Sequence, residues 1–124
     1  MAVVKTYREL EVWQAGMDLV EVVYAVTRTF PRDELFGLTA QTRRATISVP
    51  SNIAEGACRR TTGAFLNHVS IALGSHAEVE TCLEIAIRLK YMSSVGTEHV
   101  VVSVARTGQL LNGLRRSLEA RPPR

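Results

Sequence analysis

The stretch from residue 35 to residue 60 carries two apolar rows, and this feature constrains the fold more than any other. It reads LFGLTAQTRRATISVPSNIAEGACRR. Apolar or small residues spaced three and four apart mark one face of a helix. A helix packed on a single core needs one such stripe, about 100° wide. The first row comprises Leu38, Thr42, Ala45, Val49 and Ile53, and the second, on a neighbouring face, comprises Phe36, Ala40, Ile47, Ala54 and Cys58.

Two rows predict that one faces the core of the domain and the other faces a second chain. Arg43 interrupts the second row between Ala40 and Ile47, and we interpret it as one half of an intersubunit ion pair. The predicted oligomer interface therefore comprises Phe36, Ala40, Arg43, Ile47 and Ala54. Because these residues add to a complete core row, we expect copies of the chain to assemble into a cyclic homo-oligomer.

Composition and targeting signals place the chain in a broad class. Its 124 residues suffice for one domain with a proper core, and 46% hydrophobic with 22% charged residues is ordinary for a globular protein. A net charge of +3 does not identify a nucleic-acid binder. Cys58 and Cys82 have no metal-site spacing, which predicts free, buried thiols in a reducing cytosol. The sequence starts without a signal peptide and has no run of about 20 apolar residues, so we expect a cytoplasmic protein with no membrane association.

Helical periodicity predicts an all-α, up-down-up-down antiparallel four-helix bundle, because short loops join successive helices. The expected helices span residues 8–30, 34–57, 62–89 and 97–119, followed by a disordered tail, 120–124. Asp33 is the expected cap of the second helix, and either Thr61 or Thr62 that of the third. Pro50 lies inside the second helix, where it removes one backbone hydrogen bond. We therefore expect a kink over residues 46–50, with nearby hydroxyl groups bonding the freed backbone.

The chain lacks the sequence signatures of metal sites and of common enzymes. A di-iron bundle needs Glu-x-x-His pairs, and the residues three positions before His68, His76 and His99 are Phe65, Leu73 and Gly96. His76 and Glu80 are four residues apart, and we interpret them as a histidine at the core edge paired with a carboxylate. Ser48 and Ser51 near Glu55 fit backbone repair around Pro50 better than hydrolysis. We expect no cofactor, no metal and no catalytic activity.

Clustered arginines are the remaining candidates for a site. Arg59 and Arg60 follow the second helix, and Arg115 and Arg116 lie near the end of the fourth. In this topology both helices end at the same pole, which Arg121 and Arg124 would also reach. Such a cluster could hold phosphates without sequence preference. The alternative is a solvated cluster that suits the negative ends of the helix dipoles.

Four segments resemble one bacterial family. They are YRELEVWQ, FGLTAQTRRATISVPSNIAEG, FLNHVSIALGSHAEVETCLEIA and LLNGLRRSLE. Over residues 7–119 they are similar to the four helix bundle proteins encoded in intervening sequences of large-subunit ribosomal RNA genes. They are similar also to the accessory variability determinant of diversity-generating retroelements.

The resemblance implies a homopentamer of four-helix protomers with a basic surface. The retroelement relative binds nucleic acid and a reverse transcriptase, which makes both expected partners here. Carried over to this chain, the motif emphasises residues that we interpret as determinants of fold and assembly, with Asn52 and Glu55 bonding neighbouring helices or chains. These residues are Arg43, Arg44, Pro50, Ser51, Asn52, Glu55 and Gly56.

Two functional hypotheses follow. The first is a non-catalytic homo-oligomer that binds RNA or DNA through Arg59, Arg60, Arg115 and Arg116, as an accessory to a nucleic-acid enzyme. The second is a protein–protein interaction scaffold with no nucleic-acid role. Few basic residues on the third helix and additional valines in the fourth favour the second hypothesis.

Overall fold

The computed structural model describes residues 6–122, and within this range four α-helices form the fold. A short 3-10 helix, η1 (Tyr7–Glu9), precedes α1 (Glu11–Thr27). The connection to α2 (Ala40–Ala57) contains η2 (Arg32–Glu34) and the π-helical turn η3 (Leu35–Thr39). α3 (Thr62–Arg88) and α4 (Ser94–Glu119) complete the chain. Residues 123 and 124 of the predicted tail lie outside the described residues.

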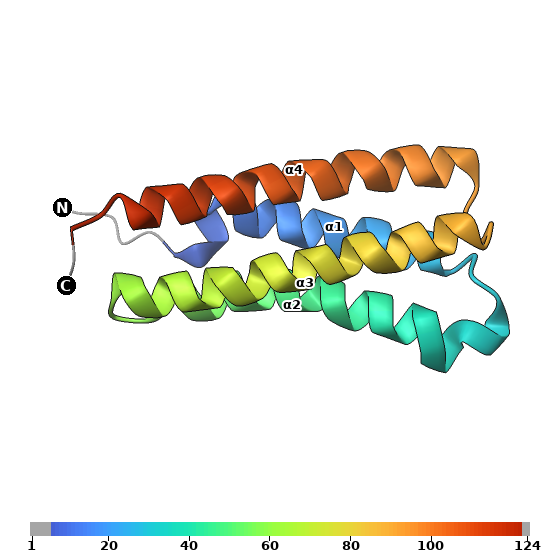
Figure 1. Ribbon diagram of the computed structural model, residues 1–124, viewed down its shortest axis with the longest axis horizontal. Helices are drawn as coiled ribbons and strands as arrows, with labels where there is room; N and C mark the ends of the chain where they lie inside the picture. The colour runs from blue at the N-terminus through green and yellow to red at the C-terminus, as the bar shows by residue number, and fades with distance from the viewer. Residues whose placement is uncertain (1–5, 123–124) are drawn as a thin grey trace.

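The helices form the predicted antiparallel bundle (Figure 1). α2 packs against α1 and α3, and α4 packs against α3 and α1. We call the end that holds residues 6–10, 57–62 and 119–122 the terminal pole. The opposite end, with residues 28–39 and 89–96, is the distal pole. The C-terminal ends of α2 and α4 therefore share the terminal pole, as the sequence predicts.

The first apolar row of α2 faces the core. Thr42, Val49 and Ile53 are fully buried, and Ala45 is 5% exposed. The core has two hydrophobic clusters along the bundle axis. The distal cluster comprises Leu19, Val23, Val26, Ala45, Val79, Leu83, Val100 and Val104, and the terminal cluster comprises Val12, Val49, Ile53, Ala72 and Leu111.

In each helix, a small or polar residue stands in the sequence between the members of the two clusters. Gly16, Thr46, His76 and Thr107 each stand between a residue of one cluster and a residue of the other. The threonines bond backbone carbonyl oxygens, Thr46 Oγ1 at 2.7 Å from Thr42 O and Thr107 Oγ1 at 2.8 Å from Ser103 O. His76 Nε2 lies 2.8 Å from Val104 O. Because a carbonyl only accepts, Nε2 donates, and the buried ring is satisfied.

The start of α2 differs from the prediction of a regular helix over 34–57. Gly37 has φ −107° and ψ −111°, which breaks the helical geometry before Ala40. Glu34 rather than Asp33 caps this turn, since its Oε1 accepts a hydrogen bond from Leu38 N at 3.2 Å. A Cβ at residue 37 would lie 2.9 Å from that same Oε1, so a larger residue there would displace the capping carboxylate.

Pro50 lies inside continuous helix. Residues 46–50 remain helical, and Pro50 is buried against Gly16, where an added Cβ would lie 3.3 Å from Pro50 Cβ. Ser48 does not repair the backbone as predicted, because its hydroxyl group bonds Ser75 Oγ on α3 at 2.7 Å. The non-helical angles in this segment are at Gly37, whereas α2 runs through Pro50, which packs on α1 at Gly16. The kink over residues 46–50 stays a prediction.

The N-terminal caps of the last two helices are serine and threonine hydroxyl groups. Thr61, one of the two predicted alternatives, accepts a hydrogen bond from Ala64 N. Ser93 accepts one from Gly96 N, so α4 begins at Ser94 and not at the predicted Thr97. α1 is shorter than the predicted 8–30, since Leu10 separates it from η1 and it ends at Thr27. Among the described residues, no helix is long and apolar enough to cross a membrane.

Candidate nucleic-acid interface at the terminal pole

The terminal pole contains a groove bordered by arginines. Its volume is about 670 Å³, and it lies where η1, the α2–α3 connection and the end of the described chain meet. Arg59, Arg60 and Arg121 all line it, which brings together three of the arginines that the sequence places at this pole. We call it the basic groove, and its other lining residues are Thr6, Tyr7, Leu10, Ala57, Thr61, Thr62, Phe65 and Pro122.

The other predicted arginines share the pole but not the groove. Arg115 and Arg116 are exposed near the end of α4, and they are not among the described residues that line the basic groove. Arg124 lies outside the described residues. Of the predicted cluster, the basic groove therefore brings together Arg59, Arg60 and Arg121, and a role for Arg115 and Arg116 in binding stays a prediction.

Tyr7 also lines the basic groove, and the sequence analysis did not predict it as a site residue. Tyr7 lines the basic groove and packs edge-on against Trp13, with ring centroids 5.4 Å apart. The guanidinium carbon of Arg8 lies 5.5 Å from the Tyr7 centroid and 5.7 Å from the Trp13 centroid. The segment YRELEVW contains all three side chains, but only the 3-10 turn of η1 brings the tyrosine to the groove.

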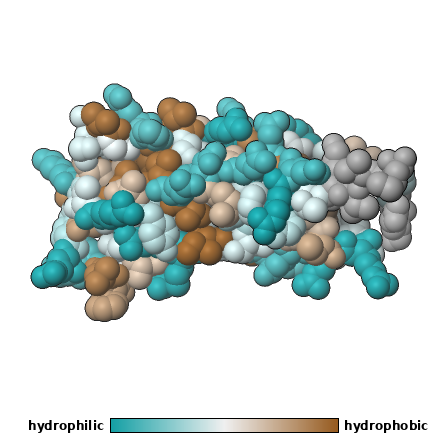
Figure 2. Space-filling model, turned by 180° about the vertical axis from the view of Figure 1, so that it is seen from behind, coloured by the Kyte–Doolittle hydropathy of each residue, from teal (hydrophilic) through white to brown (hydrophobic). Residues whose placement is uncertain are grey.

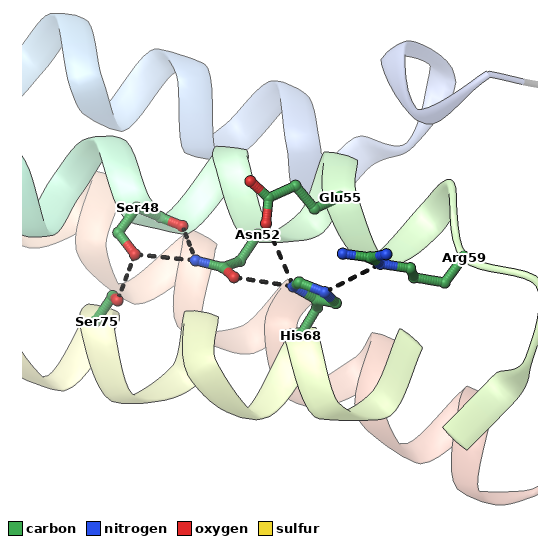
Figure 3. Close-up of polar contacts among 6 residues, drawn as sticks. All are labelled: Ser48, Asn52, Glu55, Arg59, His68 and Ser75. Atoms are coloured by element: carbon green, nitrogen blue, oxygen red, sulfur yellow. Dashed lines mark hydrogen bonds and ion pairs between the residues drawn. The ribbon is translucent and has the colours of Figure 1, made fainter. Parts of the chain in front are cut away.

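A line of polar contacts between α2 and α3 leads into the basic groove (Figure 3). We call it the polar seam, and it comprises Ser48, Asn52, Glu55 and Arg59 with His68 and Ser75 of α3. Asn52 Nδ2 donates to Ser48 O at 2.9 Å and to Ser48 Oγ at 3.0 Å, while Asn52 Oδ1 lies 3.0 Å from His68 Nδ1. The sequence predicts that Asn52 and Glu55 bond neighbouring helices or chains, and here the partner is the neighbouring helix.

The partners of His68 determine its tautomer. Arg59 Nε lies 3.3 Å from His68 Nε2, and because a guanidinium only donates, Nε2 is the acceptor. Nδ1 then carries the hydrogen and donates to Asn52 Oδ1, with Glu55 Oε2 at 3.6 Å. His68 thus accepts from Arg59 at the groove through Nε2, while Nδ1 donates to Asn52. Among the described residues, every buried side-chain nitrogen or oxygen has a hydrogen-bond partner.

The remaining motif residues divide between packing and exposure. Gly56 is buried where α2 and α3 approach closely, and a Cβ there would lie 2.8 Å from His68 Cβ and from Phe65 Cδ1. Arg44 and Ser51 are exposed on the outer side of α2. The motif therefore combines a close helix contact, a polar seam and solvent-facing groups.

The second apolar row of α2 lies on the outside of the protomer. Phe36 is 91% exposed and Ile47 is 42% exposed, while Ala40 and Ala54 are half-buried. Figure 2 shows the face behind that of Figure 1, where hydrophobic residues gather over the half toward the distal pole. The interface role of these residues stays a prediction.

Arg43 is engaged within its own chain. Its Nε donates to Thr27 Oγ1 at 2.9 Å, and its guanidinium carbon lies 4.4 Å from the Tyr24 ring centroid. The guanidinium therefore joins α2 to α1. The predicted intersubunit ion pair would have to add to these contacts, and it stays a prediction.

Titratable groups elsewhere give no metal site among the described residues, where no three His, Cys, Asp or Glu side chains could share an ion. His76 Nδ1 lies 3.5 Å from Glu80 Oε1, so the predicted pairing of this histidine with a carboxylate is present. Burial raises the pKa of Cys82, whereas the other thiol, Cys58, is exposed rather than buried as expected. The hydrogen bond to Glu34 raises the pKa of Tyr91 at the distal pole.

Comparison with known families identifies the group to which the chain belongs. A family model described as 23S rRNA-intervening sequence protein matches residues 8–113. The chain belongs to this family. The match confirms the resemblance seen in the helical segments and covers all four helices of this family member except the last turns of α4.

A solved structure with the same fold comes from Bacteroides thetaiotaomicron. It is a protein of unknown function from the S23 ribosomal protein family, with a TM-score of 0.77 and 22% sequence identity. The superposition covers 85% of this family member and 98% of the other chain. At this identity the likeness concerns the fold alone. A comparison with curated proteins finds no match.

Proposed function

We propose that this family member is a non-catalytic, self-associating protein that binds RNA or DNA through the phosphate backbone at its terminal pole. The observation that carries the proposal is the basic groove, which Arg59, Arg60 and Arg121 line together. Three guanidinium groups around one hollow attract a phosphate chain and release its counterions. Because they carry no arrangement for reading base edges, we expect binding with little sequence preference.

Positioning of Arg59 supports a site over a solvated cluster. Its Nε bonds His68, which is itself held by Asn52. The terminal amino groups are then the donors with which Arg59 would bind a phosphate, and bidentate guanidinium–phosphate pairs are among the stronger charged hydrogen bonds. Tyr7 at the rim offers a ring on which an unpaired base could stack. These features favour single-stranded nucleic acid.

Paired charge reversals test the proposal. We expect Arg60→Glu with Arg121→Glu to weaken binding of a labelled mixed-sequence RNA about 10-fold or more and to reduce the salt dependence, because two phosphate contacts are lost. The matched control is Arg28→Glu with Arg32→Glu, an equal charge change among exposed residues near the distal pole. Fluorescence anisotropy over a salt series, with the oligomeric state checked by light scattering, measures both. Equal losses in the two variants, or no binding of RNA and DNA by the wild-type chain at low salt, would exclude the groove.

The second candidate function is a scaffold with wholly proteinaceous interfaces. It is favoured by the exposure of large apolar side chains, with Phe36 at 91%, Val95 at 73% and Val102 at 68%. Large apolar side chains in solvent mark interaction surfaces where they gather into a contiguous patch. A chain that assembles or captures protein partners after nuclease treatment, yet binds no nucleic acid, would favour the scaffold. A chain that stays monomeric at high concentration and captures no partner would exclude it.

A further inference from the structure

A groove runs along the outside of the bundle between α1 and α4. It consists of a hollow of about 260 Å³ toward the distal pole and a second hollow of about 390 Å³ nearer the middle of the bundle. Val22 of α1 and His99 of α4 line both hollows, so the two are continuous. We call them together the α1–α4 groove.

The walls of the α1–α4 groove carry apolar side chains that are open to solvent. On α4, Val95 and Val102 are 73% and 68% exposed, and a separation of seven residues places them on one face of the helix. On α1, the exposed Ala25 and the half-buried Val22 line the groove. Covering this surface would remove apolar area from water, which favours binding of an apolar partner.

Two carboxylates flank the groove on its α1 side. Asp18 and Glu21 are exposed, line the groove and stand three residues apart on one face of α1. Among the described residues, neither belongs to an ion pair, whereas the arginine of the opposite wall, Arg106, has its Nη2 3.7 Å from Glu11 Oε2. His99 is the remaining titratable group of the described lining. The charge left without a partner in the groove is therefore negative.

Neighbouring surfaces do not share this combination. Arg28, just past the end of α1, lines a different hollow. The groove between α3 and α4 contains Glu80 and Glu84, but both are paired within α3. Glu80 Oε1 lies 3.5 Å from His76 Nδ1, and Glu84 Oε2 accepts from Arg88 Nε at 3.0 Å. Apolar walls and unpaired carboxylates therefore occur together in the α1–α4 groove.

We propose that the α1–α4 groove binds a basic amphipathic helix of a partner protein. Ala15 and Val26 of α1 both line the groove, and a rise of 1.5 Å per residue separates them by about 16 Å, or about three turns of a docked helix. Such a helix lays an apolar row of three-and-four spacing on the valines and places Lys or Arg beside Asp18 and Glu21. The carboxylates disfavour a phosphate backbone in the same place.

Synthetic peptides test the proposal. The probe is a fluorescein-labelled helix of about 18 residues with leucines at steps of three and four and lysines on both flanks, and its matched peptide has glutamate in place of every lysine. We expect the wild-type chain to bind the basic peptide about 10-fold or more tightly than the acidic one, with an affinity that falls as salt is added. Fluorescence anisotropy measures both affinities.

Variants of each wall locate the peptide. We expect Val102→Asp to weaken binding of the basic peptide about 10-fold or more, because it places a carboxylate under the apolar row. Asp18→Lys with Glu21→Lys should weaken it by a similar factor of about 10, because the lysines of the peptide then meet like charge. Circular dichroism verifies that both variants are folded.

Matched controls carry the same changes outside the groove. Val101→Asp introduces a carboxylate at an exposed valine of α4 that lines the α3–α4 groove instead. Glu78→Lys with Glu84→Lys makes an equal charge change at exposed positions of α3. Both controls should bind the basic peptide like the wild type. The inference is independent of the basic groove at the terminal pole, so Val102→Asp should also bind labelled RNA like the wild type.

Several outcomes would overturn the assignment. They are no binding of the basic peptide at concentrations up to about 100 μM, equal affinities for the basic and acidic peptides, or equal losses in the groove variants and their controls. A wild-type chain whose self-association is abolished by Val102→Asp would also overturn it, because the occupant of the groove is then a second copy.

Discussion

At the scale of single residues, His68 joins the packing of the bundle to the candidate site. One ring nitrogen bonds Asn52 inside the polar seam, and the other accepts from Arg59 at the basic groove. The ring is half-buried between α2 and α3, whereas Arg59 is exposed. A single side chain therefore contributes to stability and to the placement of a guanidinium group.

We expect His68→Leu to lower the free energy of unfolding by about 1–3 kcal/mol, because Asn52 Oδ1 loses its donor in a half-buried setting. Urea denaturation measures this change. The same variant should bind RNA more weakly than the wild type, since Arg59 loses the group that positions it. Asn67→Leu, the neighbouring exposed position, is the control and should change stability by less than about 0.5 kcal/mol. Equal effects at the two positions would contradict the role given to His68.

At the scale of secondary-structure elements, the pairing of α2 with α3 depends on a close approach at one end and hydroxyl contacts further along. Gly56 allows the approach, and Ser48 with Ser75 bridges the two helices near their middle. The bridge is 2.7 Å long and half-buried. Substitutions that add a single carbon should therefore have opposite effects at crowded and open glycines of these helices.

We expect Gly56→Ala to destabilise the fold by about 1–3 kcal/mol, because its Cβ would overlap with His68 Cβ and with the ring atom Cδ1 of Phe65. Gly74→Ala is the matched variant on α3. A Cβ at residue 74 meets no heavy atom within 4 Å among the described residues. Alanine there should stabilise the fold by about 0.5–1 kcal/mol through its higher helix propensity. Thermal and urea unfolding compare the two, and shifts of the same sign would be inconsistent with the packing described.

At the scale of the whole molecule, the core of the bundle is fully buried, whereas its outer surface exposes large apolar side chains. The inner row of α2 is buried, and the outer row leaves Phe36 and Ile47 in solvent. Association of copies would remove this surface from water only in the folded state. Assembly should therefore contribute to apparent stability through mass action.

We expect the melting temperature of the wild-type chain to rise with protein concentration, because only folded chains associate and a higher concentration favours the associated state. Differential scanning calorimetry measures the melting temperature at each protein concentration over a 100-fold range, about 1 to 100 μM. Phe36→Asp should melt at a temperature independent of concentration. A wild-type melting temperature that does not change over the range would contradict association in solution.

The local pattern of the sequence was enough to predict the helices, their antiparallel order and the core-facing row of α2. These properties follow from steps of three and four residues, which place apolar side chains on one face whatever the neighbours are. The family membership also followed from residues read along single helices. Arg59 and Arg60 were predicted at the terminal pole because a short connection must follow the end of α2.

Only the tertiary structure determined which distant side chains meet. His68 bonds Asn52 and Arg59, Arg43 packs on Tyr24, and Tyr7 reaches the basic groove. None of these contacts follows from helical periodicity, because periodicity describes one helix at a time. Contacts between helices depend on their rotation and axial offset, which close packing at Gly16 and Gly56 and the turn at Gly37 set in three dimensions.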